Sequence, residues 1–332
     1  MIPWLACLAL AFAPFSPTTP LSPQEQRALA LQVTLDRAGF SPGEIDAHLG
    51  VNTMRASDAF RRGGGNPDAG GVPATMNYTI TEQDAAGPFT PDIPSDLMQQ
   101  AKLDALGYRN VVEALGEKFH VSPALLKRLN PSVEFKAGAQ IAVPNVLDAL
   151  QPAPPARGGR PTPDPSHPAN ILVTVSRSDS SLTLTDGEGH VLFYAPVTTG
   201  SEHDPLPLGD WTVTGVQHNP KFRYNPALFW DADASHSKAT IPSGPNNPVG
   251  SVWINLSLKG YGIHGTAQPS EIGKTESHGC VRLTNWDAKT LAAMVEKGAL
   301  VAFLDSSPAS AARAAQISSS RDKSTRSFRR HK

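Results

Sequence analysis

The sequence predicts a multidomain protein in which a small α-helical module and a small α+β module precede a mostly β C-terminal domain. Three observations support this prediction. The chain has 332 residues with 31 prolines and 27 glycines, too long and too interrupted for one typical domain. Residues 151–168 contain seven prolines and cannot build a core, so they mark a boundary. Beyond residue 169, apolar and polar residues alternate with the two-residue period of β-strands.

The N-terminal end is an apolar run over residues 1–16. It is shorter than the roughly 20 residues that a bilayer crossing needs, so it predicts a secretory signal and no membrane span. Cys7 lies within this run, and its removal would leave Cys280 as the only cysteine. An unpaired thiol in an exported protein is a candidate reactive group.

Two modules are expected before the Pro-rich boundary. Leu31 and Leu35 have helical spacing, and Asn52 and Thr53 are capping candidates for a second helix. A Gly-rich linker follows this helical module. The α+β module should contain a strand at 78–81, helices at 110–119 and 122–130 and a closing strand at 140–146, with an insertion at 88–106. The expected segments are a signal peptide at 1–20, the helical module at 22–62, a linker at 63–77, the α+β module at 78–147, a Pro-rich linker at 151–168, the mostly β domain at 169–306 and a basic disordered tail at 307–332.

The mostly β domain should contain at least seven strands and one helix. Residues 171–176, 181–186 and 190–200 predict three strands, the last two joined as a hairpin by a Gly-containing turn. The remaining expected strands lie at 211–217, 251–257, 261–265 and 299–304, and the helix lies at 285–297. A sandwich or a barrel fits this pattern. The near-zero net charge favours neither nucleic-acid nor membrane binding, and the basic tail is either a solvated end or weakly adhesive to anionic polymers.

The candidate reactive centre is the stretch 261–283, YGIHGTAQPSEIGKTESHGCVRL. A cysteine attacks carbonyl groups as the thiolate, so it needs a neighbouring imidazole to accept the proton. His264 ends a short expected strand, and the polar connection after it is long enough to fold back and bring Cys280 to face it. Pairing with the imidazole is expected to lower the thiol pKa below its free value of about 8.5.

The strings I-H-G-T and S-H-G-C-V-R resemble the catalytic motif of the L,D-transpeptidases (YkuD domain) of bacterial cell walls. This resemblance implies a β-sandwich of the family's own type, with Cys280 as the nucleophile, His264 as the general base and the carbonyl of Gly265 orienting the imidazole. It also implies substrate-binding roles for the neighbouring residues of the motif, with Arg282 engaging a substrate carboxylate. The implied substrate-binding residues are Ser277, His278, Gly279 and Arg282.

The two N-terminal modules also resemble known families, and these resemblances imply that they bind the cell wall. Residues 22–62 resemble a peptidoglycan-binding helical module, and residues 78–147 resemble a LysM glycan-binding module. The implied partners are peptidoglycan stem peptides and glycan strands, and the implied location is the periplasm or cell wall. No cofactor and no metal are expected.

Several alternatives stay open from the residues alone. Cys280 could be a small buried hydrophobic residue, or it could bind zinc together with His264 and His278. His278 could be structural. The protein could hydrolyse tetrapeptide stems as an L,D-carboxypeptidase, or it could be a non-catalytic wall-binding scaffold.

Overall fold

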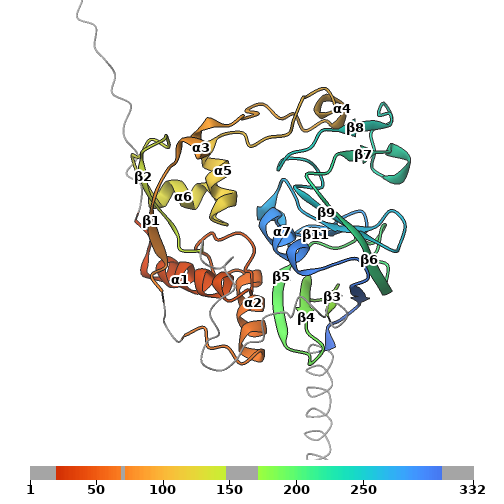
Figure 1. The fold of residues 1–332 in the computed structure, drawn as a ribbon, viewed down its shortest axis with the longest axis horizontal. Helices are drawn as coiled ribbons and strands as arrows, with labels where there is room; N and C mark the ends of the chain where they lie inside the picture. The colour runs from red at the N-terminus through yellow and green to blue at the C-terminus, as the bar shows by residue number, and fades with distance from the viewer. Residues whose placement is uncertain (1–19, 69–71, 147–170, 309–332) are drawn as a thin grey trace, which may run out of the picture.

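A computed structural model describes residues 20–68, 72–146 and 171–308, which form two lobes (Figure 1). Among the described residues, the N-terminal lobe holds six α-helices and a two-stranded sheet. The C-terminal lobe holds an eight-stranded sheet, a second two-stranded sheet, one α-helix, α7, and two short 3-10 helices, Pro226–Leu228 and Pro269–Glu271. The expected Pro-rich linker and nearly all of the expected signal peptide and basic tail lie outside the described residues. Within the described residues, no helix is both long enough and apolar enough to cross a membrane.

The N-terminal lobe begins with two helices, α1 (Pro23–Arg37) and α2 (Val51–Arg62). A capping box starts α1, because Ser22 and Glu25 satisfy each other's backbone N–H groups. The next strand, β1 (Thr75–Thr79), starts earlier than expected and pairs antiparallel with β2 (Gln140–Pro144). The helices between these two strands are α3 (Glu82–Ala86), α4 (Leu97–Gln100), α5 (Val111–Lys118) and α6 (Pro123–Leu129).

The two expected N-terminal modules share one hydrophobic core. Leu29 and Val33 of α1 pack in the same cluster as Leu115 and Phe119 of the second module. The predicted helices near 110–119 and 122–130 are confirmed, each starting at a side-chain cap, Asn110 for α5 and Ser122 for α6. The helical module and the α+β module therefore pack as one unit.

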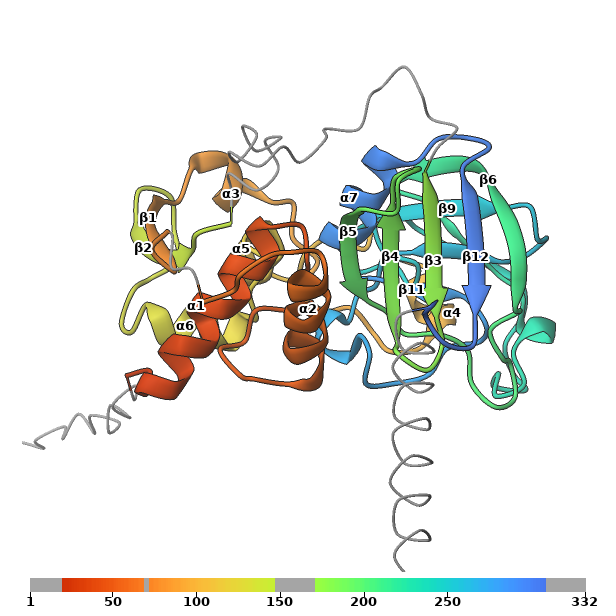
Figure 2. The ribbon, with the colours of Figure 1, turned by 90° about the horizontal axis from the view of Figure 1, so that it is seen from below.

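The C-terminal lobe is built on a single curled sheet with strand order β11-β10-β9-β6-β12-β3-β4-β5 (Figure 2). The neighbours β12 and β3 are parallel, as are β10 and β11, and the other pairs are antiparallel. The bounds are β3 (Leu172–Ser176), β4 (Ser181–Thr185), β5 (Val191–Pro196), β6 (Gly209–His218), β7 (Phe222–Tyr224), β8 (Ala239–Ile241), β9 (Val252–Leu256), β10 (Gly262–His264), β11 (Val281–Arg282), α7 (Asn285–Met294) and β12 (Leu300–Leu304).

The expected sandwich is therefore corrected to one continuous sheet. The ten-residue strand β6 belongs to both halves of this sheet, and its pairing with β9 shifts register between Val213 and Gly215. Such a bulge increases local twist and bends a strand. The two halves then enclose one core together with α7, which is why the alternating sequence pattern resembles that of a sandwich. The seven predicted strands and the helix are present, whereas β7, β8 and β11 are too short to carry a sequence period.

The N-terminal lobe covers the outer edge of this sheet at β5. The backbone of residues 39–41 bonds to both sides of Tyr194, with Ser41 N–H donating to the Tyr194 carbonyl at 2.8 Å and Tyr194 N–H donating to Gly39 at 2.9 Å. The Phe40 ring packs against the Tyr194 ring. Because an open edge strand invites unwanted pairing, this contact both protects the sheet and joins the lobes.

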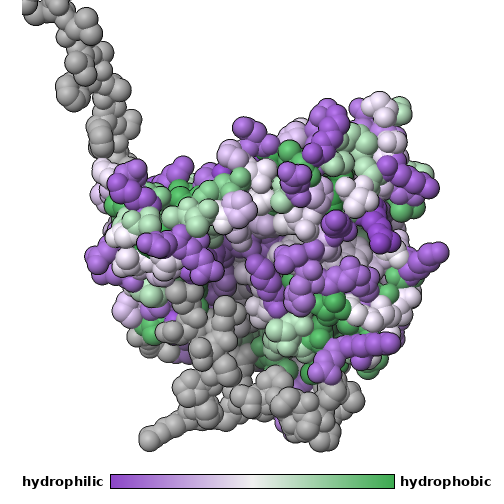
Figure 3. Space-filling model, turned by 45° about the horizontal axis from the view of Figure 1, so that its top comes forward, coloured by the Kyte–Doolittle hydropathy of each residue, from purple (hydrophilic) through white to green (hydrophobic). Residues whose placement is uncertain are grey.

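The insertion in the α+β module makes a second connection between the lobes. Residues 93–106, which include α4, cross to the small sheet formed by β7 and β8 (Figure 1). Leu106 is buried with Tyr224 and Ile241 in a small separate core. In the space-filling view the upper edge of the molecule is continuous from one lobe to the other (Figure 3). The sequence predicted this segment only as an insertion.

Candidate active site

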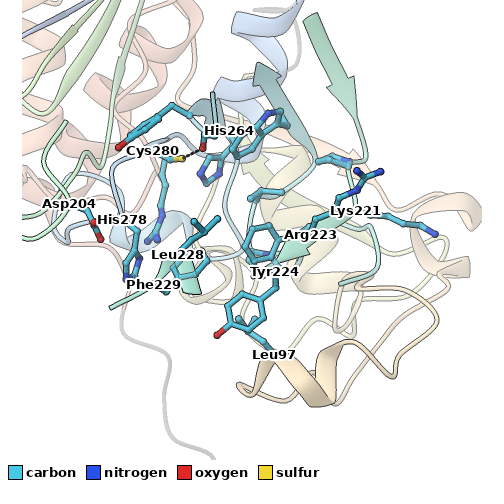
Figure 4. Close-up of a pocket in the computed structure, with 18 of the residues that line it drawn as sticks. Leu97, Asp204, Lys221, Arg223, Tyr224, Leu228, Phe229, His264, His278 and Cys280 are labelled. Atoms are coloured by element: carbon cyan, nitrogen blue, oxygen red, sulfur yellow. Dashed lines mark hydrogen bonds between the residues drawn. The ribbon is translucent and has the colours of Figure 1, made fainter. Parts of the chain in front are cut away.

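The strand β10 lies at the centre of the candidate site. It pairs antiparallel with β9 and parallel with β11, and this register places His264 opposite Arg282. Cys280 immediately precedes β11, and its thiol lies 4.0 Å from the carbonyl oxygen of Gly260. The side chains of His264 and Cys280 line one cavity of about 1110 Å³, where they lie next to each other (Figure 4). Cys280 is partly exposed to this cavity, so it is not sealed in the core.

The His264 ring is held in one orientation by two contacts. Its Nδ1–H donates to the carbonyl of Gly265 at 2.7 Å, and its face stacks on Trp253 with ring centroids 5.1 Å apart. Because a carbonyl oxygen can only accept, Nδ1 carries the proton and Nε2 keeps a free lone pair. His264 is only 4% exposed, so the ring has little room to turn. The imidazole is therefore oriented as a proton acceptor.

The electrostatics correct the expected thiolate. Burial, helped by the positive charge of Arg282, lowers the pKa of His264 to about 3. Burial also raises the pKa of the Cys280 thiol, although a backbone hydrogen bond from Gly262 and the charge of Arg282 act in the opposite direction. The expectation of a lowered thiol pKa is wrong for this state, because a neutral imidazole offers no positive charge. The resting pair is a neutral thiol beside a neutral imidazole.

The loop before Cys280 is shaped by Ser277 and Gly279. Ser277 is 2% exposed, and its hydroxyl donates to the Cys280 carbonyl at 2.6 Å, so its side chain faces the loop and not the cavity. Gly279 has a φ of +90°, and a Cβ there would lie 2.8 Å from the Tyr261 ring. In the described part of the chain, the N–H groups of Gly279 and Cys280 bond to no protein acceptor. Neither amide is therefore committed to an acceptor among the described residues.

Arg282 and His278 differ in their contacts. Both line the cavity, and no described side chain forms a hydrogen bond or an ion pair with the Arg282 guanidinium. His278 is tied to the loop between β7 and β8, with Nε2 2.8 Å from Asp231 Oδ1 and its ring 5.0 Å from that of Phe229. Arg282 is thus free to meet an anion, whereas His278 already has protein partners.

Sequence reasoning missed several residues that build this site. Trp253 is the direct cross-strand partner of His264, which the predicted hairpin register could have revealed. Phe229, Asp231 and Leu97 have no such signal, because they come from a loop and from the insertion in the other lobe. No group of three metal-binding side chains is found among the described residues.

The sequence of this lobe matches a known family. Residues 170–302 match the family model of the L,D-transpeptidase catalytic domain, YkuD. Residues 170–302 are an L,D-transpeptidase catalytic domain. A Bacillus subtilis protein named as the L,D-transpeptidase YkuD is 27% identical over 195 residues, which are 58% of this chain and 92% of that protein. An Escherichia coli protein named as the L,D-transpeptidase YbiS is 45% identical over 95 residues, which are 29% of this chain and 28% of that one.

A solved L,D-transpeptidase structure from Mycobacterium smegmatis is similar over 40% of this chain and 58% of its own, with 20% identity and a TM-score of 0.33. That overall similarity is low, so the assignment rests on the sequence matches. These matches place an L,D-transpeptidase catalytic domain in the C-terminal lobe. In this transpeptidase domain, the curled sheet brings Cys280, His264 and Arg282 to one cavity. They belong to segments separated by a 15-residue connection.

Proposed function

We propose that this protein is an exported enzyme that cross-links peptidoglycan stem peptides through a thioester on Cys280. The observation that carries the proposal is the proton-accepting Nε2 of His264 beside Cys280, in a cavity that also presents the unpaired Arg282. A neutral base and a neutral thiol are poised for a coupled step, in which the thiol loses its proton as it attacks.

In the first half-reaction, Sγ of Cys280 attacks the carbonyl carbon of the donor's third residue. The thiol proton moves to Nε2 of His264, and the Gly279 and Cys280 amides hold the oxyanion. The bond from the carbonyl carbon to the D-alanine nitrogen then breaks, and His264 returns its proton to that nitrogen. The products are a thioester and free D-alanine.

In the second half-reaction, a side-chain amine of another stem attacks the thioester. His264 accepts a proton from the amine and returns it to the departing sulfur of Cys280. This step gives an amide cross-link and restores the neutral pair. The carbonyl of Gly265 favours the imidazolium that forms transiently, since it accepts the Nδ1–H in both states.

The remaining residues of the motif receive different proposed roles. Arg282 binds a substrate carboxylate, because its guanidinium faces the cavity without a protein partner. Ser277 positions the nucleophile by fixing the Cys280 carbonyl, and not by touching substrate. His278 positions the wall of the cavity through Asp231.

The N-terminal lobe is proposed to hold the enzyme on the wall. Strands β1 and β2, with α5 and α6 among the four helices between them, support the LysM resemblance. The first two helices of the lobe fit the peptidoglycan-binding resemblance. Glycan strands are the proposed ligand of this lobe. The periplasm or cell wall is the proposed location.

The test is intact-protein mass spectrometry with a purified tetrapeptide stem. Wild-type protein should gain the mass of the acyl group and release D-alanine, and Cys280→Ala should do neither. Adding a stem with a free side-chain amine should then yield a dimer. Trimmed tripeptide without dimer would show an L,D-carboxypeptidase instead, and full activity in Cys280→Ala would reject the nucleophile.

A further inference from the structure

The cavity that holds Cys280 is built partly from the other lobe. We name residues 93–106 the strap and residues 222–241, from β7 to β8, the flap. Leu97 of the strap lines the same cavity as Cys280, and the flap contributes several neighbouring lining residues (Figure 4). The strap was predicted as an insertion in a glycan-binding module, yet it forms part of the wall of the transpeptidase cavity.

A histidine–carboxylate pair joins the strap to the flap, beside the apolar contacts between them. His236 Nε2 lies 2.9 Å from Asp96 Oδ2, and His236 Nδ1 lies 3.0 Å from the Tyr224 hydroxyl. The other oxygen of Asp96 caps α4 by accepting the Gln99 N–H at 2.7 Å. The Asp96 carboxylate thus caps the N-terminus of α4 with one oxygen and binds the flap with the other.

The far end of the strap enters the backbone of the catalytic lobe. Leu106 N–H donates to the Ser243 carbonyl at 2.9 Å, and Asn246 N–H donates to the Leu106 carbonyl at 3.0 Å. The Leu106 side chain is fully buried against Tyr224 and Ile241. The strap is therefore anchored at one end through its backbone and at the other through Asp96.

A continuous series of contacts links Asp96 to the loop that carries Cys280. From His236 the series passes to Tyr224, whose ring lies 5.4 Å from Phe229, and then to His278, whose ring lies 5.0 Å from Phe229. His278 is two residues from Cys280. The buried flap residues Tyr224 and Ile241 pack in one small core with Leu106 and with partly buried residues of the strap.

We propose that Asp96 is a positioning residue for the transpeptidase, through which the N-terminal lobe holds the flap in place as a wall of the substrate cavity. This proposal rests on the proposed function for its kinetic consequences. Loss of the Asp96–His236 contact loosens the flap, widens the cavity and weakens stem-peptide binding, while the chemistry at Cys280 and His264 is unchanged.

The variants are chosen to break this contact alone. Asp96→Ser keeps a side chain that can cap α4 but is too short to reach His236. His236→Phe keeps a ring against Tyr224 and removes both hydrogen bonds. Asp104→Ser is the matched control, since Asp104 is an exposed acidic residue of the same strap.

The kinetic readout separates positioning from chemistry. Each of the two variants should raise KM for the tetrapeptide by about three- to tenfold, with kcat within about twofold of wild type. The double variant should be no worse than His236→Phe alone, because that change already removes the contact with Asp96. Alkylation of Cys280 by iodoacetamide, a small reagent, should not slow. Unchanged KM, effects that multiply, or slower alkylation would each overturn the proposal.

A second readout stands apart from any activity. Amide hydrogen exchange over residues 226–238 should be at least about fivefold faster in Asp96→Ser and in His236→Phe than in wild type and in Asp104→Ser. Unchanged exchange in the flap would overturn the proposal. If exchange in the flap is faster in these variants but wild-type protein never reacts with the tetrapeptide, Asp96 does hold the flap and the proposed reaction is wrong.

Discussion

At the scale of single residues, the site depends on two neutral groups and one charge. Burial disfavours both the imidazolium of His264 and the thiolate of Cys280, so neither charge exists before substrate arrives. Arg282 disfavours the imidazolium further and favours the thiolate. This neutral pair differs from the thiolate–imidazolium pair that some cysteine enzymes store, so in the proposed reaction Cys280 becomes a thiolate only during the attack.

This leads to a prediction for the pH dependence of Cys280 alkylation. The rate with iodoacetamide follows the thiolate, so it should keep rising to a midpoint above the ordinary thiol value of about 8.5. No inflection should occur near pH 6.5, because His264 is neutral above about pH 3. Arg282→Gln should move the midpoint higher, since Arg282 lowers the pKa of Cys280. A plateau already reached by pH 6 would show a preformed thiolate and contradict this prediction.

At the scale of elements, very short pairings hold the site together. The parallel contact of β10 with β11 is only two residues long, yet it sets the relative position of Cys280 and His264. The strap also packs closely against the catalytic lobe, where Leu106 lies against Gly244. Gly244 has a φ of +145°, and a Cβ at this position would overlap the backbone of Leu106. The approach of strap to catalytic lobe therefore requires glycine.

Gly244→Ala should lower the free energy of unfolding by about 2 kcal/mol or more, through backbone strain and the clash with Leu106. The matched control is Gly215→Ala, where a Cβ meets nothing within 4 Å. That variant should change stability by less than about 1 kcal/mol. Urea unfolding followed by tryptophan fluorescence measures the free energy of unfolding of both variants. Equal values would show that the contact between Gly244 and Leu106 can accept a Cβ without loss of stability.

At the scale of the whole molecule, a buried polar cluster joins the lobes. Asp287 at the start of α7 accepts hydrogen bonds from Thr284 at 2.7 Å and from Ser41 of the N-terminal lobe at 2.9 Å. His120 binds Asp36 at 2.9 Å and stacks on Trp286. Burial, with the negative charge of Asp36 adding to it, raises the pKa of Asp287 to about 7. We therefore expect the stability of this interface to depend on pH.

The sign of this effect follows from linkage. Between the ordinary pKa of 3.8 and the folded value of about 7, the folded protein binds one more proton at Asp287 than the unfolded chain, so stability falls as pH rises through this window. The free energy of unfolding of wild type minus that of Asp287→Asn should therefore fall between pH 4 and pH 7, by as much as about 4 kcal/mol. Asp104→Asn is the exposed control. A difference that stays constant or rises with pH would contradict the prediction.

Many of the strands and helices could be predicted from the sequence, because a long element shows a clear period of apolar residues or a recognisable cap. The strand at 171–176 alternates over six residues, and Ser122 with Pro123 marks the start of α6 by local chemistry alone. The pairing partners were harder to foresee. The sequence cannot show that β6 is shared by both halves of one sheet, because a bulge at Val213 and Gly215 leaves no periodic signal.

The residues of the candidate site also fall into those that the sequence predicted and those that it did not. Cys280, His264 and Gly265 lie within one motif, so a local pattern located them, and the structure brings the first two to one cavity. Trp253 was within reach of a register argument. Leu97 and Asp96 were not, since they lie far along the chain and contact the flap only after both lobes have packed.

By itself, the sequence determined the local chemistry of this protein: which thiol and which imidazole share a motif, and which segments form most of the strands and helices. These properties depend on neighbouring residues and on short periods. Only the tertiary structure decided that the imidazole and thiol are neutral and that the two N-terminal modules share a core. It also decided that a segment of the other lobe borders the cavity. Burial and long-range contacts are properties of the packed chain, so no local pattern carries them.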